Sequence, residues 1–213
     1  MPKIPASERD MFYETRRREL CEVALRLWAE RGVERTSVAN IADEAGIAKG
    51  TFYLYYESKE ALLLDVLRRN SLVPNVLGLI EALQRKSLDE AVREFVRGAW
   101  LHLGSHRDLV LVVMRELPTH LDAAQEFVER LMVPGTRALA ARLEALMSEE
   151  RTTKLSTVLA VRALIGMVVT VFVTQELLGA KRFVPLSDAE VVETVSELFL
   201  RGVAPAGEGV ESR

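Results

Sequence analysis

The spacing of apolar residues is the feature that most constrains the fold of this chain. Leu20, Val23, Ala24, Leu27 and Trp28 lie at positions i, i+3, i+4, i+7 and i+8. These intervals match the 3.6-residue turn of an α-helix and place the apolar side chains on one face. Nearly every later segment repeats this spacing. The sequence therefore predicts an all-α fold.

Glycine and serine residues mark where the first helices should end and begin. A long helix is expected from about residue 10 to residue 31, because Gly32 follows it as a terminating glycine. Two short helices are expected on either side of Gly46, and Ser58 should cap the next one. Further helices are expected at about 75–86, 88–103, 107–117, 121–148, 153–179 and 187–202.

Three local signals refine the later helices. Pro134-Gly135 should kink or split the helix at 121–148, because proline removes a helical hydrogen bond. Ser187 and Glu190 have the spacing of a capping box at the start of the last helix. The stretch "VVTVFV" (168–173) is rich in β-branched residues, which also favour a strand. An isolated strand would have no partner, so we expect a helix.

Composition narrows the classes of function. The chain has 213 residues and a formal net charge of −3, so it is not a polycation that binds nucleic acid or membranes by overall charge. Any binding of anions must come from the local placement of its cations. The single cysteine, Cys21, excludes an internal disulfide. Its apolar-periodic surroundings predict a buried, unreactive thiol.

The sequence carries no sign of a targeting segment or of a common catalytic motif. The start, "MPKIPASERD", is polar and lacks the apolar region of a signal peptide. The most apolar run, 163–173, is well short of the ~20 residues that span a bilayer. No HExxH, GxSxG or glycine-rich phosphate loop is present. We therefore expect a cytoplasmic protein that is not an enzyme, needs no cofactor and has no membrane partner.

Tyrosines gather on one short segment. Three of the four in the chain, Tyr53, Tyr55 and Tyr56, lie within "GIAKGTFYLYYESKEAL" (46–62). A helix, a tight turn at Gly46 and a second helix form the pattern of a helix-turn-helix, whose second helix enters the major groove of DNA. The alternative is a helical hairpin with a polar face, whose tyrosines are half-buried.

A helical wheel over 48–56 separates two faces. Phe52 and Tyr56 fall together and should face the core, while Leu54 points the opposite way. Lys49 stands in the first turn, where a cation is unfavourable for the helix alone and favourable beside a phosphate. The predicted DNA contacts are Thr36, Ser37, Lys49, Gly50, Thr51, Tyr53, Tyr55 and Lys59.

The stretches "LWAERG" (27–32) and "TSVANIADEAGIAKGTFYLYYESKEALL" (36–63) resemble the TetR family of bacterial transcriptional regulators. The resemblance covers roughly residues 15–66. It implies DNA contacts at the positions just named, except Ser37, and also at Leu54. It further implies core positions at Ile41, Ala45, Phe52 and Tyr56. Two residues depart from the family pattern. Ala39 and Leu54 replace longer or polar side chains, which leaves the operator sequence open.

The resemblance also implies an arrangement for the whole chain. Residues 1–60 would form the helix-turn-helix DNA-binding domain, 61–204 a helical effector-binding and dimerisation domain, and 205–213 a disordered tail. By the same resemblance, the last two helices would pair with those of a second copy. Their apolar stripes, which can also complete the protomer's own core, contain Val158, Val161, Ile165, Val168, Val191, Val195, Leu198 and Phe199.

Relatives in this family hold an effector pocket in the second domain. Candidate lining residues, each of which also suits an ordinary core, are Phe95, Trp100, Leu103, Met114, Phe127, Met132, Met167 and Phe172. Such a pocket would suit a lipophilic molecule. Candidate polar anchors are His102, His106, Arg115, Glu116, His120, Gln175 and Glu176. His102 and His106 have the spacing of two metal ligands on a helix, but Gly104-Ser105 lies between them, and we expect no metal site.

These observations together predict a dimeric, ligand-responsive transcriptional regulator, with repression of a palindromic operator as the default outcome. Two other classes of protein fit the sequence less well. A ligand-independent architectural DNA-binding protein would not need so large an additional apolar helical domain. A helical enzyme would need a catalytic constellation, and Cys21 has no histidine near it in the sequence. Arg16, Arg17 and Arg18 are either a solvated charge run or an arm that reaches the backbone or the minor groove of DNA.

Overall fold

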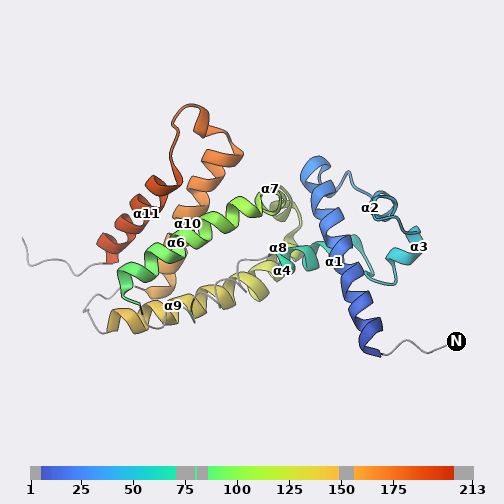
Figure 1. The fold of residues 1–213 in the computed structure, drawn as a ribbon, viewed down its shortest axis with the longest axis horizontal. Coiled ribbons are helices and arrows are strands. Elements are labelled where there is room, and N and C mark those ends of the chain that lie inside the picture. The colour runs from blue at the N-terminus through green and yellow to red at the C-terminus, as the bar shows by residue number, and fades with distance from the viewer. Residues whose placement is uncertain (1–5, 71–79, 81–85, 149–155, 204–213) are drawn as a thin grey trace, which may run out of the picture. The chain divides into compact units, whose positions relative to one another are not determined.

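The computed structural model describes residues 6–70, 80, 86–148 and 156–203 (Figure 1). Most of the helix predicted at 75–86 and all of the tail predicted at 205–213 lie outside these residues. Within the described residues every regular element is helical and none is a strand. The all-α prediction is confirmed, and so is the helical prediction for 168–173, which lies in α10 and the turn after it.

The chain divides into two compact units. The amino-terminal unit combines residues 1–71 with residues 106–130, and the carboxyl-terminal unit combines 72–105 with 131–213. The amino-terminal unit therefore extends past the boundary predicted at residue 60. The reason is packing, because α4 (Lys59–Arg69) buries Leu62, Leu63, Val66 and Leu67, and it packs on α1 and α8 of the same unit.

The amino-terminal unit is built on one long helix. Its other elements pack either on α1 (Ala6–Arg31), whose Trp28 is fully buried, or on the helices that contact α1. They are α2 (Val38–Glu44), α3 (Lys49–Phe52), α4 (Lys59–Arg69), α7 (Arg107–Glu116), a 3₁₀ turn (Leu117–Thr119) and α8 (Leu121–Phe127). The helix predicted at 48–56 is shorter than expected. Its α-helical part ends at Phe52, and residues 53–55 form a turn closed by tighter hydrogen bonds, such as Tyr55 N to Phe52 O at 2.9 Å.

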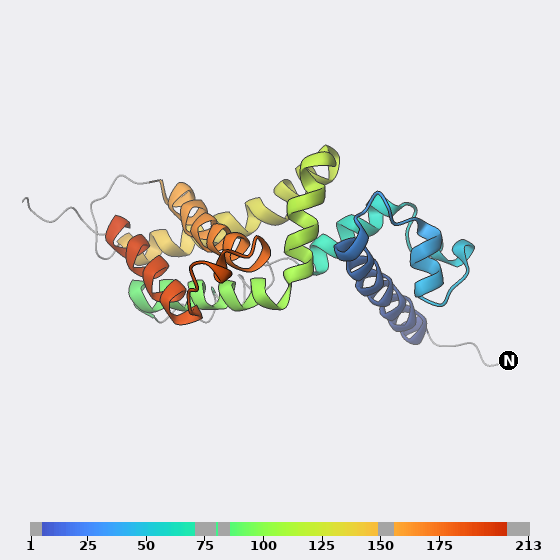
Figure 2. The same ribbon diagram turned by 90° about the horizontal axis from the view of Figure 1, so that it is seen from above.

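The carboxyl-terminal unit is a helical bundle (Figure 2). In it α6 packs against α9, α10 and α11, and α10 packs against α9 and α11. Trp100 and Phe172 meet edge to face in its core, with ring centroids 5.6 Å apart. The bounds are α6 (Leu88–Ser105), α9 (Val133–Ser148), α10 (Thr157–Phe172), a π-helical turn (Val173–Leu177), a 3₁₀ turn (Ala180–Arg182) and α11 (Asp188–Val203).

The local signals in the sequence correspond to local features of the structure. The helix predicted at 121–148 is divided into α8, a π-helical turn (Val128–Met132) and α9, in which Pro134 is the second residue. The Ser187–Glu190 capping box is present, with hydrogen bonds of 2.8 and 3.2 Å between each side chain and the other residue's N–H. Ser58 caps α4 by accepting a hydrogen bond from the Ala61 N–H.

A buried carboxylate joins α1 and α4. Asp65 is 5% exposed and accepts hydrogen bonds from the Tyr56 hydroxyl at 2.7 Å and from Arg17 at 2.8 Å. It also accepts hydrogen bonds from Arg68 and Arg69. Burial by itself raises the pKa of a carboxyl, but the hydrogen bonds from Tyr56, Arg68 and Arg69 outweigh it and hold the pKa of Asp65 at about 2.

Cys21 belongs to the same cluster. Its Sγ lies 3.2 Å from the Tyr56 hydroxyl, and the residue is 2% exposed. Burial raises the pKa of the Cys21 thiol to about 11, which keeps it protonated and unreactive. The prediction of a buried cysteine is confirmed.

We expect the Asp65 cluster to make stability depend on acid pH. The folded-state pKa of Asp65 lies below its ordinary value of 3.8, so its contribution is complete above that value and is lost as the pH falls from about 4 to about 2. This loss should lower the free energy of unfolding by about 2 kcal/mol. Urea denaturation of the wild type and Asp65→Asn across this pH range measures it.

The substitution Asp65→Asn should cost about 2–4 kcal/mol at neutral pH, because it leaves partly buried arginines without their carboxylate. The matched control is Glu19→Gln, which removes the partner of Arg16 in a more exposed pair. That change should cost less than about 1 kcal/mol. Parallel pH curves for the wild type and Asp65→Asn would contradict the assignment.

Candidate nucleic-acid interface

The turn between α2 and α3 is fixed by local backbone geometry. Ser37 and Asn40 form a capping box at the start of α2, with the Asn40 N–H donating to Ser37 Oγ at 3.1 Å. Gly46 has a φ of +68°, a conformation that glycine adopts without strain. The Ile47 N–H then donates to the Ala42 carbonyl at 2.9 Å and closes the turn. These elements form the predicted helix-turn-helix.

The second helix and the turn after it present two kinds of side chain. Phe52 is 0% exposed and Tyr56 is 3% exposed, as the helical wheel predicts. Leu54 is 70% exposed and Tyr53 is 50% exposed. Lys49 and Gly50 are exposed, while Thr51 and Tyr55 are half-buried. The buried pair anchors both ends of a short exposed surface, which we call the Tyr53–Tyr55 turn.

Three predicted DNA-contact residues are already engaged within the protein. Thr36 is 1% exposed and its hydroxyl donates to the Gly32 carbonyl at 2.7 Å. Lys59 donates to the Val33 carbonyl at 2.8 Å. The hydroxyl of Ser37 lies in the capping box of α2. In this structure these three side chains stabilise the start of α2, and their contact with DNA stays a prediction.

Other cations near the motif divide into paired and unpaired. Arg16 pairs with Glu19 at 2.7 Å and Arg17 pairs with Asp65, so two members of the arginine run are held within the protein. Among the described residues, Lys49, Arg18 and Arg35 form no hydrogen bond or ion pair within the chain. Arg35, two residues before the cap of α2, is exposed and was not singled out from the sequence.

The loop between α1 and α2 is held by residues from the end of α7. The Glu116 carboxylate is 5% exposed and accepts a hydrogen bond from the Val33 N–H at 3.3 Å. Arg115 pairs with Glu116 at 2.7 Å and donates to the Trp28 carbonyl at the end of α1. Gly32, with a φ of +92°, packs close to both side chains. We call this arrangement the α7 clamp.

His120 adds a further contact to the same loop. Its Nδ1 lies 2.9 Å from the Glu116 carbonyl and its Nε2 lies 3.1 Å from Glu34. The hydrogen bond with the Glu116 carbonyl and the nearby Glu34 raise the pKa of His120, against the effect of burial. Arg115, Glu116 and His120 were predicted as anchors of an effector pocket, and the structure places them beside the helix-turn-helix. These residues lie more than eighty positions after Val33 in the chain, so no sequence spacing indicates the contact.

The fourth tyrosine of the chain also reaches the motif. Tyr13, in the first half of α1, donates its hydroxyl to the Leu54 carbonyl at 3.0 Å. Its ring lies 5.0 Å from that of Tyr55, at an interplanar angle of 32°. Forty-one residues separate Tyr13 from Leu54 in the chain, and no sequence spacing indicates the contact.

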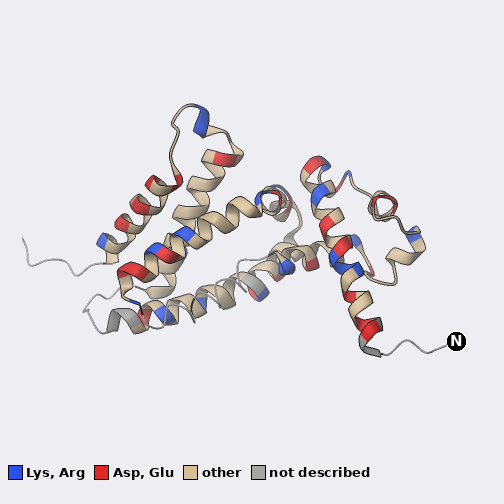
Figure 3. Ribbon diagram, in the orientation of Figure 1, with Lys and Arg blue, Asp and Glu red and all other residues tan. Residues whose placement is uncertain are grey.

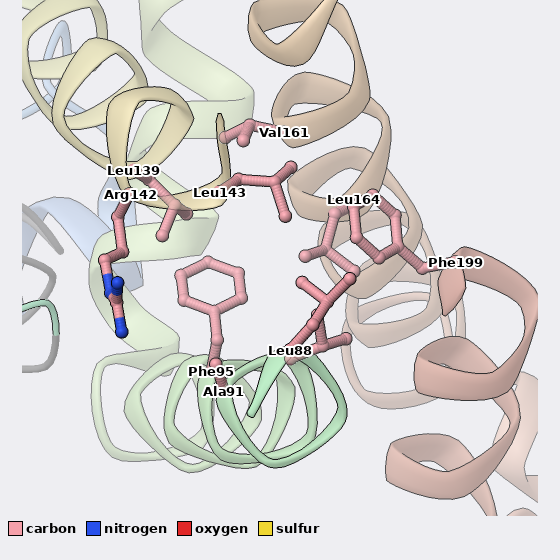
Figure 4. Close-up of a pocket in the computed structure, with 10 residues that line it drawn as sticks. Leu88, Ala91, Phe95, Leu139, Arg142, Leu143, Val161, Leu164 and Phe199 are labelled. Atoms are coloured by element: carbon pink, nitrogen blue, oxygen red, sulfur yellow. The ribbon is translucent and has the colours of Figure 1, made fainter. Parts of the chain in front are cut away.

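The carboxyl-terminal unit contains a small, partly open apolar cavity of about 30 Å³ (Figure 4). It is lined by leucines and phenylalanines from α6, α9, α10 and α11, and Arg142 lies on its wall. Figure 4 shows the Phe95 ring rising from α6 beside Arg142. A volume of this size holds about one water molecule. The cavity is therefore closed to a larger ligand in this conformation.

The predicted pocket residues do not come together around this cavity. Phe95 lines it, whereas Trp100, Leu103 and Phe172 are buried in the core of the bundle. Met114 and Phe127 lie in the amino-terminal unit. Met114 and Met132 are 50% and 43% exposed. His106 lies between α6 and α7, so His102 and His106 do not share one helix. The pocket list stays a prediction.

A second, open depression of about 520 Å³ runs along the outer faces of α10 and α11. We call it the α10–α11 groove, and Met167, Val171, Val191, Val195 and Leu198 are among its lining residues. Arg162 is the single charged residue of α10, and Figure 3 shows how sparse charge is along that helix. Of the predicted dimer residues, Val158 and Leu198 are 43% and 59% exposed, while Val161, Val168 and Phe199 are buried.

The segment Thr157–Leu177 is long and apolar enough to cross a membrane by length and composition alone. Core helices of soluble proteins pass the same test, but they are mostly buried. In this segment 22% of the most apolar window is buried within the protomer. Much of its apolar surface therefore has no cover from the rest of the described chain.

Comparison with known proteins gives consistent results for the amino-terminal residues. Residues 20–66 match the model of the family described as "Bacterial regulatory proteins, tetR family". The HTH-type transcriptional repressor KstR2 of Rhodococcus jostii is 47% identical over 53 residues, which are 25% of this chain and 26% of that protein. The HTH-type transcriptional regulator YerO of Bacillus subtilis is 27% identical over 121 residues, 55% of this chain and 42% of that protein.

These matches thus span less than half the length of either curated relative. A solved structure extends the likeness of the fold to most of the chain. The transcriptional regulator FadR of Bacillus subtilis, in complex with stearoyl-CoA, superposes with a TM-score of 0.71. It is 23% identical, and the match covers 87% of this chain and 98% of that one.

The relatives are named as transcriptional regulators and not as enzymes, which agrees with the expectation from the sequence. Their shared motif is the helix-turn-helix that the geometry above describes, in the residues where the resemblance was found. Residues 20–66 carry the helix-turn-helix of the TetR family of bacterial regulatory proteins, and most of the chain shares the fold of solved members of that family.

Proposed function

We propose that the protein is a transcriptional repressor that binds a palindromic DNA operator as a homodimer and leaves it when a lipophilic small molecule binds. The observation that carries this proposal is the exposed surface around α3. Lys49, Tyr53 and Leu54 are exposed there, on a base that Phe52 and Tyr56 fix in the core.

The chemistry of that surface suits duplex DNA. Lys49 and Arg35 supply positive charge without an internal partner, so they are available to phosphates. The Tyr53 hydroxyl can donate to a phosphate, and the Leu54 methyl groups suit the methyl group of thymine. Phosphate contacts set affinity and position, and the contacts to base edges set sequence preference.

The DNA-binding part of the proposal predicts a specific change in salt dependence. Replacing Lys49 with Ala removes one cation at the phosphates, so the slope of log K against log salt should fall in magnitude by about one unit. Fluorescence anisotropy with a labelled duplex, at several salt concentrations, measures the slope.

The matched control for this measurement is Lys181→Ala, because Lys181 lies in the other unit and is paired with Glu176 at 2.8 Å. It should leave the slope unchanged. Equal slopes for the wild type, Lys49→Ala and Lys181→Ala would refute the assignment of Lys49 to a phosphate contact.

The dimer is supported by the uncovered apolar surface of α10 and α11. A helix-turn-helix reads a short site, and a two-fold pair of them reads two half-sites about one helical turn apart. The α10–α11 groove and the exposed Leu198 and Val158 offer the apolar area that a second copy can cover. We therefore propose that a second copy of the chain, and not a membrane, covers the apolar surface of α10, because the protein also carries a DNA-binding motif.

The substitution Leu198→Glu should shift the protein from dimer to monomer, because it places a charge in the centre of the proposed contact. Sedimentation velocity at micromolar concentration measures the mass. Leu101→Glu is the control, since Leu101 is also 59% exposed but lies on α6, outside the groove. A wild type that sediments as a monomer, or a Leu198→Glu variant that stays dimeric, would remove this interface.

The effector is proposed from the cavity of the carboxyl-terminal unit. Its lining is apolar apart from Arg142, which suits a long hydrocarbon chain with an acidic group. The structural relative FadR has been solved with stearoyl-CoA, and we extend that ligand class to this chain. Because the cavity holds about one water molecule, an acyl chain must move the helices apart to enter.

Movement of the bundle can reach the DNA-binding surface through the chain itself. α6 ends at Ser105, and α7, whose last residues form the α7 clamp, begins at Arg107. A shift of α7 would therefore act on the α1–α2 loop that leads into the helix-turn-helix. Ligand and operator would then weaken each other's binding by the same factor, as thermodynamic linkage requires.

Filling the cavity should abolish the response to ligand without changing DNA binding in the absence of ligand. Ala91→Leu occupies space in the cavity wall, so long-chain acyl-CoA should no longer lower DNA affinity, while affinity without ligand should stay near that of the wild type. Ala141→Leu, at an exposed position on α9, is the control. If no acyl-CoA or fatty acid changes the DNA affinity of the wild type, the effector class is wrong, and the alternative of a ligand-independent architectural protein gains support.

A further inference from the structure

Tyr13 makes a contact that the helix-turn-helix motif does not account for. It lies on α1, outside the residues that match the family model, and it reaches the exposed turn after α3. Its hydroxyl donates to the Leu54 carbonyl at 3.0 Å, and its ring packs against that of Tyr55 at 5.0 Å. One side chain thus holds both the backbone and a ring of the Tyr53–Tyr55 turn.

The turn has little other support. The α-helical part of α3 is a single turn, its first residue has no side-chain cap, and it ends at Phe52. The backbone hydrogen bonds of Leu54 and Tyr55 are local ones to Thr51 and Phe52. One turn of helix is not stable by itself, so its conformation depends on contacts from the rest of the protein. Phe52 and Tyr56 supply these contacts at the two ends, and Tyr13 supplies one between them.

We propose that Tyr13 is a positioning residue that fixes the backbone of the Tyr53–Tyr55 turn and thereby sets the sequence preference of DNA binding. The inference rests on the proposed DNA-binding function. Tyr13 itself does not contact the bases in this proposal. Its effect passes through Leu54, whose side chain is the most exposed apolar group of the motif.

Contacts to phosphates and contacts to base edges should respond differently when the Tyr53–Tyr55 turn moves. A phosphate contact such as that of Lys49 tolerates small movements, because the attraction between charges falls slowly with distance. Recognition of base edges depends on direct contact at short range. Loosening the Tyr53–Tyr55 turn therefore lowers affinity for the preferred sequence and leaves affinity for unrelated DNA nearly unchanged.

The test uses the full-length protein and two variants. In vitro selection from random duplexes first yields the sequence preferred by the wild type. Dissociation constants are then measured for that sequence and for a scrambled duplex, with the wild type, Tyr13→Phe and Phe12→Leu. Tyr13→Phe keeps the ring beside Tyr55 and removes only the hydrogen bond to Leu54. Phe12→Leu is the matched control, because Phe12 is 58% exposed and contacts Arg16 on its own helix.

We expect Tyr13→Phe to lower the ratio of specific to non-specific affinity by roughly 2- to 10-fold, the range given by one net hydrogen bond. Phe12→Leu should not change the ratio. A second readout needs no DNA. Amide hydrogen exchange in residues 53–56 should be faster in Tyr13→Phe than in the wild type, while exchange in α2 should be the same.

Three results would overturn the inference. The first is an unchanged ratio in Tyr13→Phe. The second is an equal loss for both duplexes, which would make Tyr13 a direct phosphate contact. The third is unchanged hydrogen exchange. If selection with the wild type enriches no DNA sequence, the proposed DNA-binding function is itself contradicted. Failure of that function is thus distinguishable from failure of the Tyr13 proposal.

Discussion

The Asp65 carboxylate is the interaction on which the amino-terminal unit depends. It receives hydrogen bonds from Arg17 on α1, from Arg69 on α4 and from Tyr56 at the end of the exposed turn. A one-turn helix gains little stability from its own hydrogen bonds. The surface between Phe52 and Tyr56 therefore takes its geometry from these buried anchors.

The sequence predicted the features that depend on neighbouring residues. Apolar periodicity gave the helices, and the short-range signals of Gly32, Gly46, Ser58 and Ser187 gave their ends, because each acts within one turn of the backbone. The family resemblance identified the motif itself. The helix predicted at 48–56 was too long, because a helical wheel assumes uniform geometry and cannot register the tighter turn that follows Phe52.

Contacts between residues that lie far apart in the chain could not be predicted from the sequence. Arg115 and Glu116 looked like pocket residues, since nothing in their neighbourhood indicates the α1–α2 loop that they contact. Tyr13 lies outside the tyrosine cluster in the sequence, and its contact with Leu54 depends on how α1 crosses the motif. The predicted pocket list mixed core and surface positions, because apolar residues that line a cavity and those that fill a core have the same pattern.

The amino-terminal unit is discontinuous along the chain, which has a consequence for the order of folding. Residues 106–130 complete a unit that begins at the amino terminus, with α7 packed on α1 and α8 packed on α4. During synthesis, the ribosome must therefore produce α6 before the first unit can cover the apolar faces of α1 and α4. The DNA-binding motif is translated first but reaches its full set of contacts only after residue 130 has left the ribosome, so a nascent chain that stops earlier exposes those faces to chaperones.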